Sequence, residues 1–169
     1  TKASTYVSVG LAYAEKGELN KAIEAYTKAL ALDPKDASAY INLGVAYMRS
    51  GLFDEAIKAN SMAVSLAPSA EAHNNLGHLY YRKGRLDEAL EECEAAVKLN
   101  PDFAMAHNNL GAVYWSKGLF DKAVEHYRIS VKLNPDNREA RHNLELAEKY
   151  KVSRMTVRQA LDTLSQQGL

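Results

Sequence analysis

Residues 70–103 read AEAHNNLGHLYYRKGRLDEALEECEAAVKLNPDF and carry the clearest structural pattern in the chain. The apolar residues of this stretch recur at spacings of three, four and seven, which is the period of a helix rather than of a strand. Gly84 interrupts the pattern in the middle and Pro101 ends it. Glycine commonly follows the end of a helix, and proline cannot continue one. The stretch therefore predicts a hairpin of two short helices.

The same pattern occurs four times along the chain of 169 residues. The four prolines and eight of the nine glycines recur at steps of 34, 33 and 34 residues: Pro34, Pro68, Pro101 and Pro135; Gly10, Gly44, Gly77 and Gly111; Gly17, Gly51, Gly84 and Gly118. A fixed period of this length is typical of a repeat array, in which each unit buries its apolar face against the next. We expect four hairpins, over 3–36, 37–69, 70–103 and 104–137.

Each glycine series has its own predicted role in the hairpin. Gly44 and its equivalents lie on apolar faces and permit close helix approach beside bulky neighbours such as Tyr47. Gly51 and its equivalents end the first helix. The second helix is expected to begin at a capping residue. The four candidate caps are Asn20, Asp54, Asp87 and Asp121.

Composition excludes several classes of protein. With 47% hydrophobic and 25% charged residues, the chain is neither disordered nor fibrous. No apolar run approaches the roughly 20 residues of a membrane helix, and no leader is visible at the start. Lys plus Arg and Asp plus Glu both number 21, so charge gives no broad reason to expect nucleic-acid binding. We expect a soluble, cytoplasmic protein without membrane insertion.

Catalytic, metal and cofactor sites are not predicted. The glycines are accounted for by the repeat, so no phosphate-binding loop remains. His73 and His107 share a column with Tyr6 and Tyr40, which indicates helix packing. Cys93 is the single cysteine, and it replaces the aromatic residue that two other repeats have at Tyr26 and Tyr127, so a small buried thiol is expected. We expect no enzyme activity, no cofactor and no small-molecule substrate.

The repeat columns resemble the tetratricopeptide repeat family from about residue 3 to residue 137. The third repeat carries most of the family pattern: His73, Leu76, Gly77, Tyr80, Gly84, Leu86, Ala89, Ala96 and Pro101. The resemblance implies an all-α, right-handed superhelix of stacked hairpins. It also implies a non-enzymatic scaffold whose first helices line a concave groove for other proteins or peptide segments.

A column of asparagines follows the first helices: Asn42, Asn75, Asn109 and Asn143. An amide both donates and accepts hydrogen bonds, so such a column suits contact with a peptide backbone. The alternative is that these asparagines bridge adjacent helices or are solvated. Arg49 and Arg82 lie two turns further along the same faces, and His78 lies between Asn75 and Arg82. These arginines suit an acidic segment or a terminal carboxylate.

Tyr81 and Trp115 form a neighbouring column with Met48. Aromatic and Met side chains are favoured anchors at interfaces, although in repeat proteins they also cover the rim between helices. Together these residues make up the predicted peptide-binding set: Asn42, Arg49, Asn75, His78, Tyr81, Arg82, Asn109, Trp115 and Asn143.

The tail departs from the glycine pattern, because Glu145 and Val152 stand where glycines are due. Residues 138–150 are expected to form a capping helix, of the kind that an array needs at an open end. A further short helix is expected over 151–169. Gly168 is the one glycine outside both series.

Residues 144–169 resemble the helix-turn-helix core of GntR-type bacterial regulators. This resemblance implies that Ser153 caps a recognition helix and that Arg154, Thr156 and Arg158 face DNA. The alternative function is therefore a DNA-binding regulator with the repeats as its sensor domain. Two other interpretations of the tail stay open: a degenerate fifth hairpin, with Val157, Leu161 and Leu164 packed inward, or a helix through which the chain self-associates.

Overall fold

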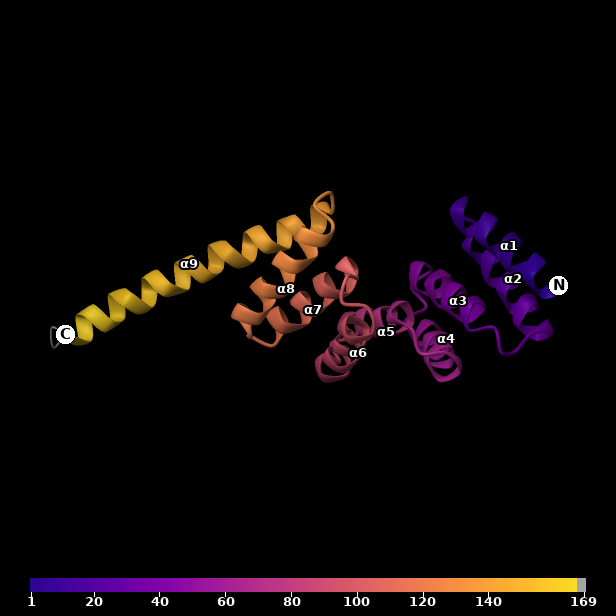
Figure 1. Ribbon diagram of the computed structural model, residues 1–169, viewed down its shortest axis with the longest axis horizontal. Helices are drawn as coiled ribbons and strands as arrows, with labels where there is room; N and C mark the ends of the chain where they lie inside the picture. Colours follow the sequence, from indigo (N-terminus) through magenta and orange to yellow (C-terminus); the bar gives the residue numbers. More distant parts are fainter. Residues whose placement is uncertain (167–169) are drawn as a thin grey trace. The chain divides into compact units, whose positions relative to one another are not determined.

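The computed structural model describes the backbone of residues 1–166 and their side chains, except those of 152, 157 and 160–166 (Figure 1). Residues 1–166 form nine α-helices and no strand. The chain divides into two compact units, Thr1–Pro101 and Asp102–Leu169. The predicted all-α fold of repeated helical hairpins is confirmed.

The first unit contains three consecutive hairpins. The second helix of each hairpin packs on the first helix of the next, and the first helices also pack on one another. The helices are α1 (Lys2–Glu15), α2 (Leu19–Leu32), α3 (Ala37–Arg49), α4 (Phe53–Leu66), α5 (Ala70–Arg82) and α6 (Leu86–Leu99).

The second unit contains one hairpin and a long final helix. The helices are α7 (Ala104–Ser116), α8 (Phe120–Leu133) and α9 (Arg138–Gln166). Helix α7 pairs with α8, and α9 packs on α8. The last turns of α9 extend past the α7–α8 hairpin (Figure 1).

Glycine ends the first helix of every hairpin, as predicted. Gly118 has φ +75°, a left-handed conformation that side chains other than glycine adopt at a cost. Its N–H donates to the Trp115 carbonyl at 3.0 Å, and the Leu119 N–H donates to the Tyr114 carbonyl at 2.9 Å. This pair of bonds is the Schellman motif. It reverses the chain within a few residues and so directs the second helix back along the first.

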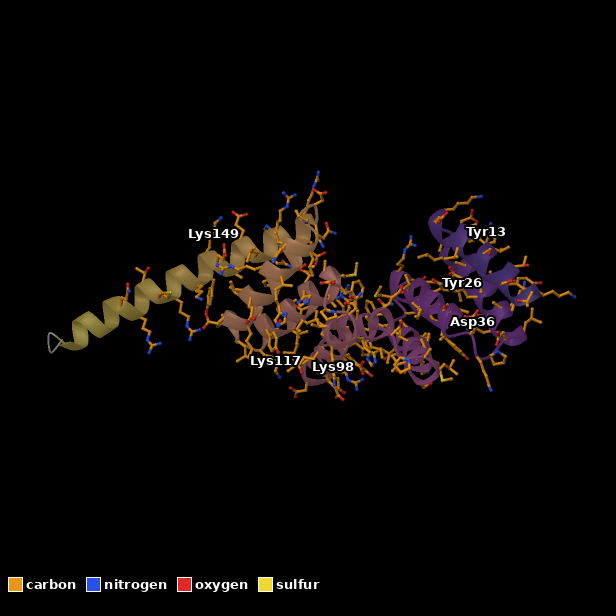
Figure 2. All side chains as sticks on the ribbon, in the orientation of Figure 1. Tyr13, Tyr26, Asp36, Lys98, Lys117 and Lys149 are labelled. Carbon is orange, nitrogen blue, oxygen red and sulfur yellow. The ribbon has the colours of Figure 1, made fainter. Side chains whose placement is uncertain are left out.

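The other glycine series lies where two helices touch, also as predicted. A methyl group at Gly10 would lie 2.5 Å from the Tyr26 ring, and one at Gly111 would lie 2.7 Å from the Tyr127 ring. Both distances are too short for two carbon atoms. Tyr26, labelled in Figure 2, is only 1% exposed, so the ring cannot move aside into solvent. Glycine is therefore required where the facing side chain is a buried tyrosine.

The predicted caps of the second helices are wrong. The N-caps of these helices lie two residues earlier than predicted, at Glu18, Leu52, Arg85 and Leu119, and none of these four residues makes a side-chain capping bond. The Schellman turn fixes the start, because its backbone bonds leave one residue between the glycine and the helix. Asp54, Asp87 and Asp121 lie inside the first turn, where a negative charge still interacts favourably with the helix N-terminus.

The prediction of two helices in the tail is also wrong. Helix α9 runs without a break from Arg138 to Gln166, about 43 Å at 1.5 Å per residue. No break occurs near residue 151 because the segment contains no glycine or proline to end a helix. Gly168 lies outside the described residues. Within residues 1–166, no helix is long and apolar enough to cross a membrane.

Candidate peptide-binding surface

Asn42 and Asn75 of the first unit differ in what their amides contact. Asn75 is 9% exposed, and its Nδ2 donates to Oδ1 of Asn60 on α4 at 3.4 Å. Asn60 is fully buried and donates in turn to the Ala56 carbonyl at 2.9 Å. Asn42 is partly exposed, and its side-chain amide makes no hydrogen bond among the described residues. Asn75 thus bridges two helices, whereas the side-chain amide of Asn42 does not.

In the second unit, Asn143 also forms a bridge. Its Nδ2 donates to Oδ1 of Asn108 on α7 at 3.1 Å, and Asn108 donates to Glu139 at 3.3 Å. Asn108 is 4% exposed, so this chain of polar contacts fixes the start of α9 against α7. Asn109 is partly buried on α7. The bridging alternative therefore describes Asn75 and Asn143.

Arg49 and Arg82 are both exposed and both contact a neighbouring hairpin. The Arg49 Nη1 donates to the Ala14 carbonyl at the end of α1, at 3.0 Å. The Arg82 guanidinium lies 5.0 Å from the centroid of the Phe53 ring. A cation at a helix C-terminus or over an aromatic face is stabilised there. These contacts orient the two side chains, which stay exposed.

The aromatic column behaves differently from the asparagines. Trp115 makes edge-on contacts with Phe120 on α8 and Tyr150 on α9, with ring centroids 4.8 and 5.1 Å apart. Such contacts add to the stability that area burial provides, so Trp115 covers the rim where three helices meet. His78 and Tyr81 lie on α5, and both are partly buried.

The residues predicted to contact DNA lie on the exposed surface of α9. Ser153, Arg154, Thr156 and Arg158 are all exposed. The Arg154 guanidinium lies 5.3 Å from the Phe120 ring centroid. Ser153 caps no helix, because it lies inside α9. The described residues of the tail therefore lack the turn that precedes a recognition helix.

The sequence analysis did not predict two polar contacts, one inside the third hairpin and one inside the fourth. His73 Nδ1 lies 2.6 Å from Oε2 of Glu92, and His107 Nδ1 lies 3.0 Å from His126 Nδ1. Each pair joins the first helix of a hairpin to its second helix. The signal was present in the sequence, because both pairs are 19 residues apart. These contacts support the prediction that His73 and His107 are packing residues.

Cys93 is buried as predicted. Burial, with a smaller contribution from the charges of Glu92 and Glu94, raises the pKa of its thiol to about 12. The thiol therefore stays protonated and unreactive at neutral pH. Among the side chains that the structure describes, no group of three or more His, Cys, Asp or Glu is arranged to hold a metal ion.

Family models match most of the repeat region and part of the tail. A model described as TPR repeat matches residues 10–51 and 77–118. A model described as tetratricopeptide repeat matches residues 37–69 and 104–137. A model for bacterial regulatory proteins of the gntR family matches residues 142–169 only. None of the curated proteins matches the chain in sequence.

Several solved structures resemble the chain. A crystal structure of MamA protein is 31% identical, with 95% of this chain and 88% of MamA aligned and a TM-score of 0.78. YrrB, a TPR protein with an unusual peptide-binding site, is 25% identical over 88% of this chain and 77% of YrrB, with a TM-score of 0.71. The pilF protein of Pseudomonas aeruginosa is alike in fold, at 24% identity over 98% and 76% of the two chains and a TM-score of 0.82.

The geometry and the matches agree. The two glycine columns, the buried residues that face the close-approach column and the matched family models all belong to one kind of hairpin. The chain belongs to the tetratricopeptide repeat family, whose members are generally non-enzymatic protein-interaction scaffolds.

Proposed function

We propose that this protein is a non-enzymatic scaffold that binds partner peptide segments along the face of its first helices. In the superhelix that the family resemblance implies, this face is the concave one. The observation that carries the proposal is the partly exposed amide of Asn42, which has no hydrogen-bond partner among the described residues. An amide of this kind can pair with a peptide backbone without specifying a side chain.

The surroundings of Asn42 support the same proposal. Arg49 lies two turns away on α3 and is held in place by the Ala14 carbonyl. A pre-oriented guanidinium loses less freedom on binding an acidic group than an unrestrained one. The similarity to YrrB, a TPR protein with an unusual peptide-binding site, adds a related example of peptide binding.

Selection from a random phage library of peptides against the immobilised full chain tests the proposal. The affinity of a selected peptide is then measured by calorimetry for three proteins: wild type, Asn42→Ala and Asn75→Ala. We expect Asn42→Ala to weaken binding about threefold to tenfold, the range for one hydrogen bond, with an unchanged melting temperature. Asn75→Ala is the matched control, and it should lower the melting temperature because Asn60 loses its partner. If no peptide is enriched, or if Asn42→Ala has no effect on any selected peptide, the proposal is wrong.

DNA binding is a second candidate function, favoured by the gntR-family match at residues 142–169. A helix-turn-helix needs a turn before its recognition helix, and α9 is continuous, so we favour the scaffold. A mobility-shift assay at about 150 mM salt should show no saturable binding. Sequence-selective binding that is lost in an Arg154→Ala, Arg158→Ala double variant would favour DNA binding instead.

A further inference from the structure

In three of the four hairpins, a lysine or arginine side chain lies over the tyrosine at one equivalent repeat position. Each cation comes from the start of the second helix, and each tyrosine from near the end of the first. The distances to the ring centroids are 5.3 Å for Lys21 over Tyr13, 4.5 Å for Arg85 over Tyr80 and 5.1 Å for Lys122 over Tyr114. Attraction between a cation and an aromatic face explains the recurrence.

The second hairpin has the tyrosine but not the cation. Its tyrosine is Tyr47, and Glu55 stands at the repeat position of Lys21 and Lys122, while Leu52 stands at that of Arg85. Among the described residues, no lysine or arginine lies over the Tyr47 ring. Within the described part of the chain, the Tyr47 ring of the second hairpin therefore has no cation over its face, whereas the equivalent tyrosine ring of each other hairpin does.

A hollow of about 220 Å³ lies at this place, between α3 and α4. We call it the Tyr47 pocket. Its walls are mostly apolar, and two charged residues also line it. The residues that matter here are Tyr40, Leu43, Tyr47, Glu55, Lys58 and Met62. The volume is below the roughly 300 Å³ of a drug-sized site, and it suits a single long side chain.

In the third hairpin, a cation contacts the residues equivalent to Tyr47 and Glu55. Glu88 occupies the repeat position of Glu55, and Tyr80 that of Tyr47. The Arg85 guanidinium lies over Tyr80, and its Nε donates to Oε1 of Glu88 at 2.9 Å. A glutamate and a tyrosine at these two positions thus hold one cation together. The second hairpin keeps both of these residues and lacks only the cation.

We propose that the Tyr47 pocket binds the side chain of a lysine or arginine in a partner peptide. The cationic group lies over the Tyr47 ring and faces the Glu55 carboxylate, while its methylene stem lies against Tyr40 and Met62. This inference rests on the proposed peptide-binding function, and it adds the charge of one side chain that the partner must present.

Of the two charged residues that line the pocket, Glu55 favours the binding of a cation and Lys58 disfavours it. Glu55 makes no ion pair among the described residues. The neighbouring Asp54 is already paired with Lys83, at 2.5 Å, so it does not compete for the incoming cation. Lys58 lines the pocket and opposes binding by repulsion. Its removal should therefore strengthen binding.

Titration with a small probe tests the pocket directly. N-acetyl-lysine methylamide is added to the full chain, and the ring signals of Tyr40 and Tyr47 are followed by NMR; N-acetyl-norleucine methylamide is the uncharged probe of similar shape. We expect saturable shifts with the lysine probe, at an affinity about threefold or more above that of norleucine, as one cation–aromatic contact provides. Equal affinities for the two probes, or no shift at either ring, would overturn the proposal.

Variants of the charged residues sharpen the test. Glu55→Lys reproduces the residue found at Lys21 and Lys122, so the protein should fold, cover Tyr47 with its own cation and lose probe binding. Glu91→Lys makes the same charge change at an exposed position on α6 and should leave probe binding unchanged. Lys58→Gln should tighten it about twofold. Probe binding that survives Glu55→Lys would rule out this pocket.

Selected phage peptides separate this inference from the proposed function. If peptides bind but show no enrichment of lysine or arginine, and Glu55→Lys does not weaken them, the pocket assignment fails and the scaffold function stands. If the lysine probe binds the pocket but no peptide is selected, the scaffold function fails and the pocket assignment stands.

Discussion

Helices α7 and α9 occupy the same place in the repeat pattern but end very differently. Helix α7 has 13 residues, and α9 has 29. Two of the sequence differences concern glycines: Gly111 in α7 and Gly118 just after it correspond to Glu145 and Val152 in α9. Gly111 faces the buried Tyr127 ring of α8, whereas Glu145 is exposed and pairs with Lys149 at 2.7 Å.

The comparison shows that the two glycines of a hairpin have separate roles. Both roles depend on a second helix that folds back along the first. Gly118 turns the chain so that α8 runs back along α7, and Gly111 lets α8 approach closely. Where no helix of the described chain folds back, as after α9, neither glycine is needed. A first helix that lacks both continues until another signal ends it.

The largest effect is expected from a side chain added at the close-approach position. Gly111→Val should lower the free energy of unfolding by about 1–3 kcal/mol, because the new side chain overlaps the buried Tyr127 ring. The matched change in α9, Glu145→Val, should alter it by less than about 0.5 kcal/mol. Urea unfolding of both variants measures the difference. Equal losses would show that Gly111 is not a contact residue.

A smaller effect is expected at the turn. Gly118→Ala should cost about 1–2 kcal/mol, because alanine is strained at φ +75°, while no atom of the structure would touch the added methyl group. Gly118→Asn should cost less, since asparagine tolerates this conformation better. Thermal unfolding of the two variants gives the order. A larger loss for asparagine would contradict backbone strain as the cause.

Breaking α9 should change helix content more than stability. Ser153→Pro removes a backbone donor and clashes with the preceding turn, so helix should be lost around residue 153. We expect a weaker helical circular-dichroism signal and a melting temperature within a few degrees of wild type, because Trp115, Phe120 and Tyr150 still pack together. A cooperative loss of the whole second unit would instead show that the distal part of α9 supports the α7–α8 hairpin.

The smallest effect concerns an exposed ion pair between α8 and α9. Lys151 lies 2.7 Å from Asp121, and its hydrogen bond and charge lower the pKa of the Asp121 carboxyl. Stability from a lowered carboxyl pKa is present above the unfolded-state value and is lost as the pH falls through the folded-state value, below about pH 4. Lys151→Gln should raise the Asp121 pKa toward its ordinary value in an NMR titration, without a measurable change in melting temperature. An unchanged pKa would show that the pair does not form in solution.

Local signals predicted the hairpins well. Gly17, Gly51, Gly84 and Gly118 mark helix ends through their own backbone conformation, and this conformation depends on the residue itself. The candidate binding residues were harder to predict. Asn42 and Asn75 share a column and cannot be distinguished in the sequence, yet Asn60 on the preceding helix engages only Asn75. The difference arises from a contact between helices, which no local pattern contains.

The repeat, its period and the close-approach and turn glycines follow from the amino-acid sequence alone, because helix period and glycine conformation are local properties. The tertiary structure determines which polar groups take part in packing contacts and which remain exposed. It paired Asn143 with Asn108 and Trp115 with Tyr150, and it placed a cation over Tyr13, Tyr80 and Tyr114 but not over Tyr47. These outcomes depend on side chains that meet only after the helices stack.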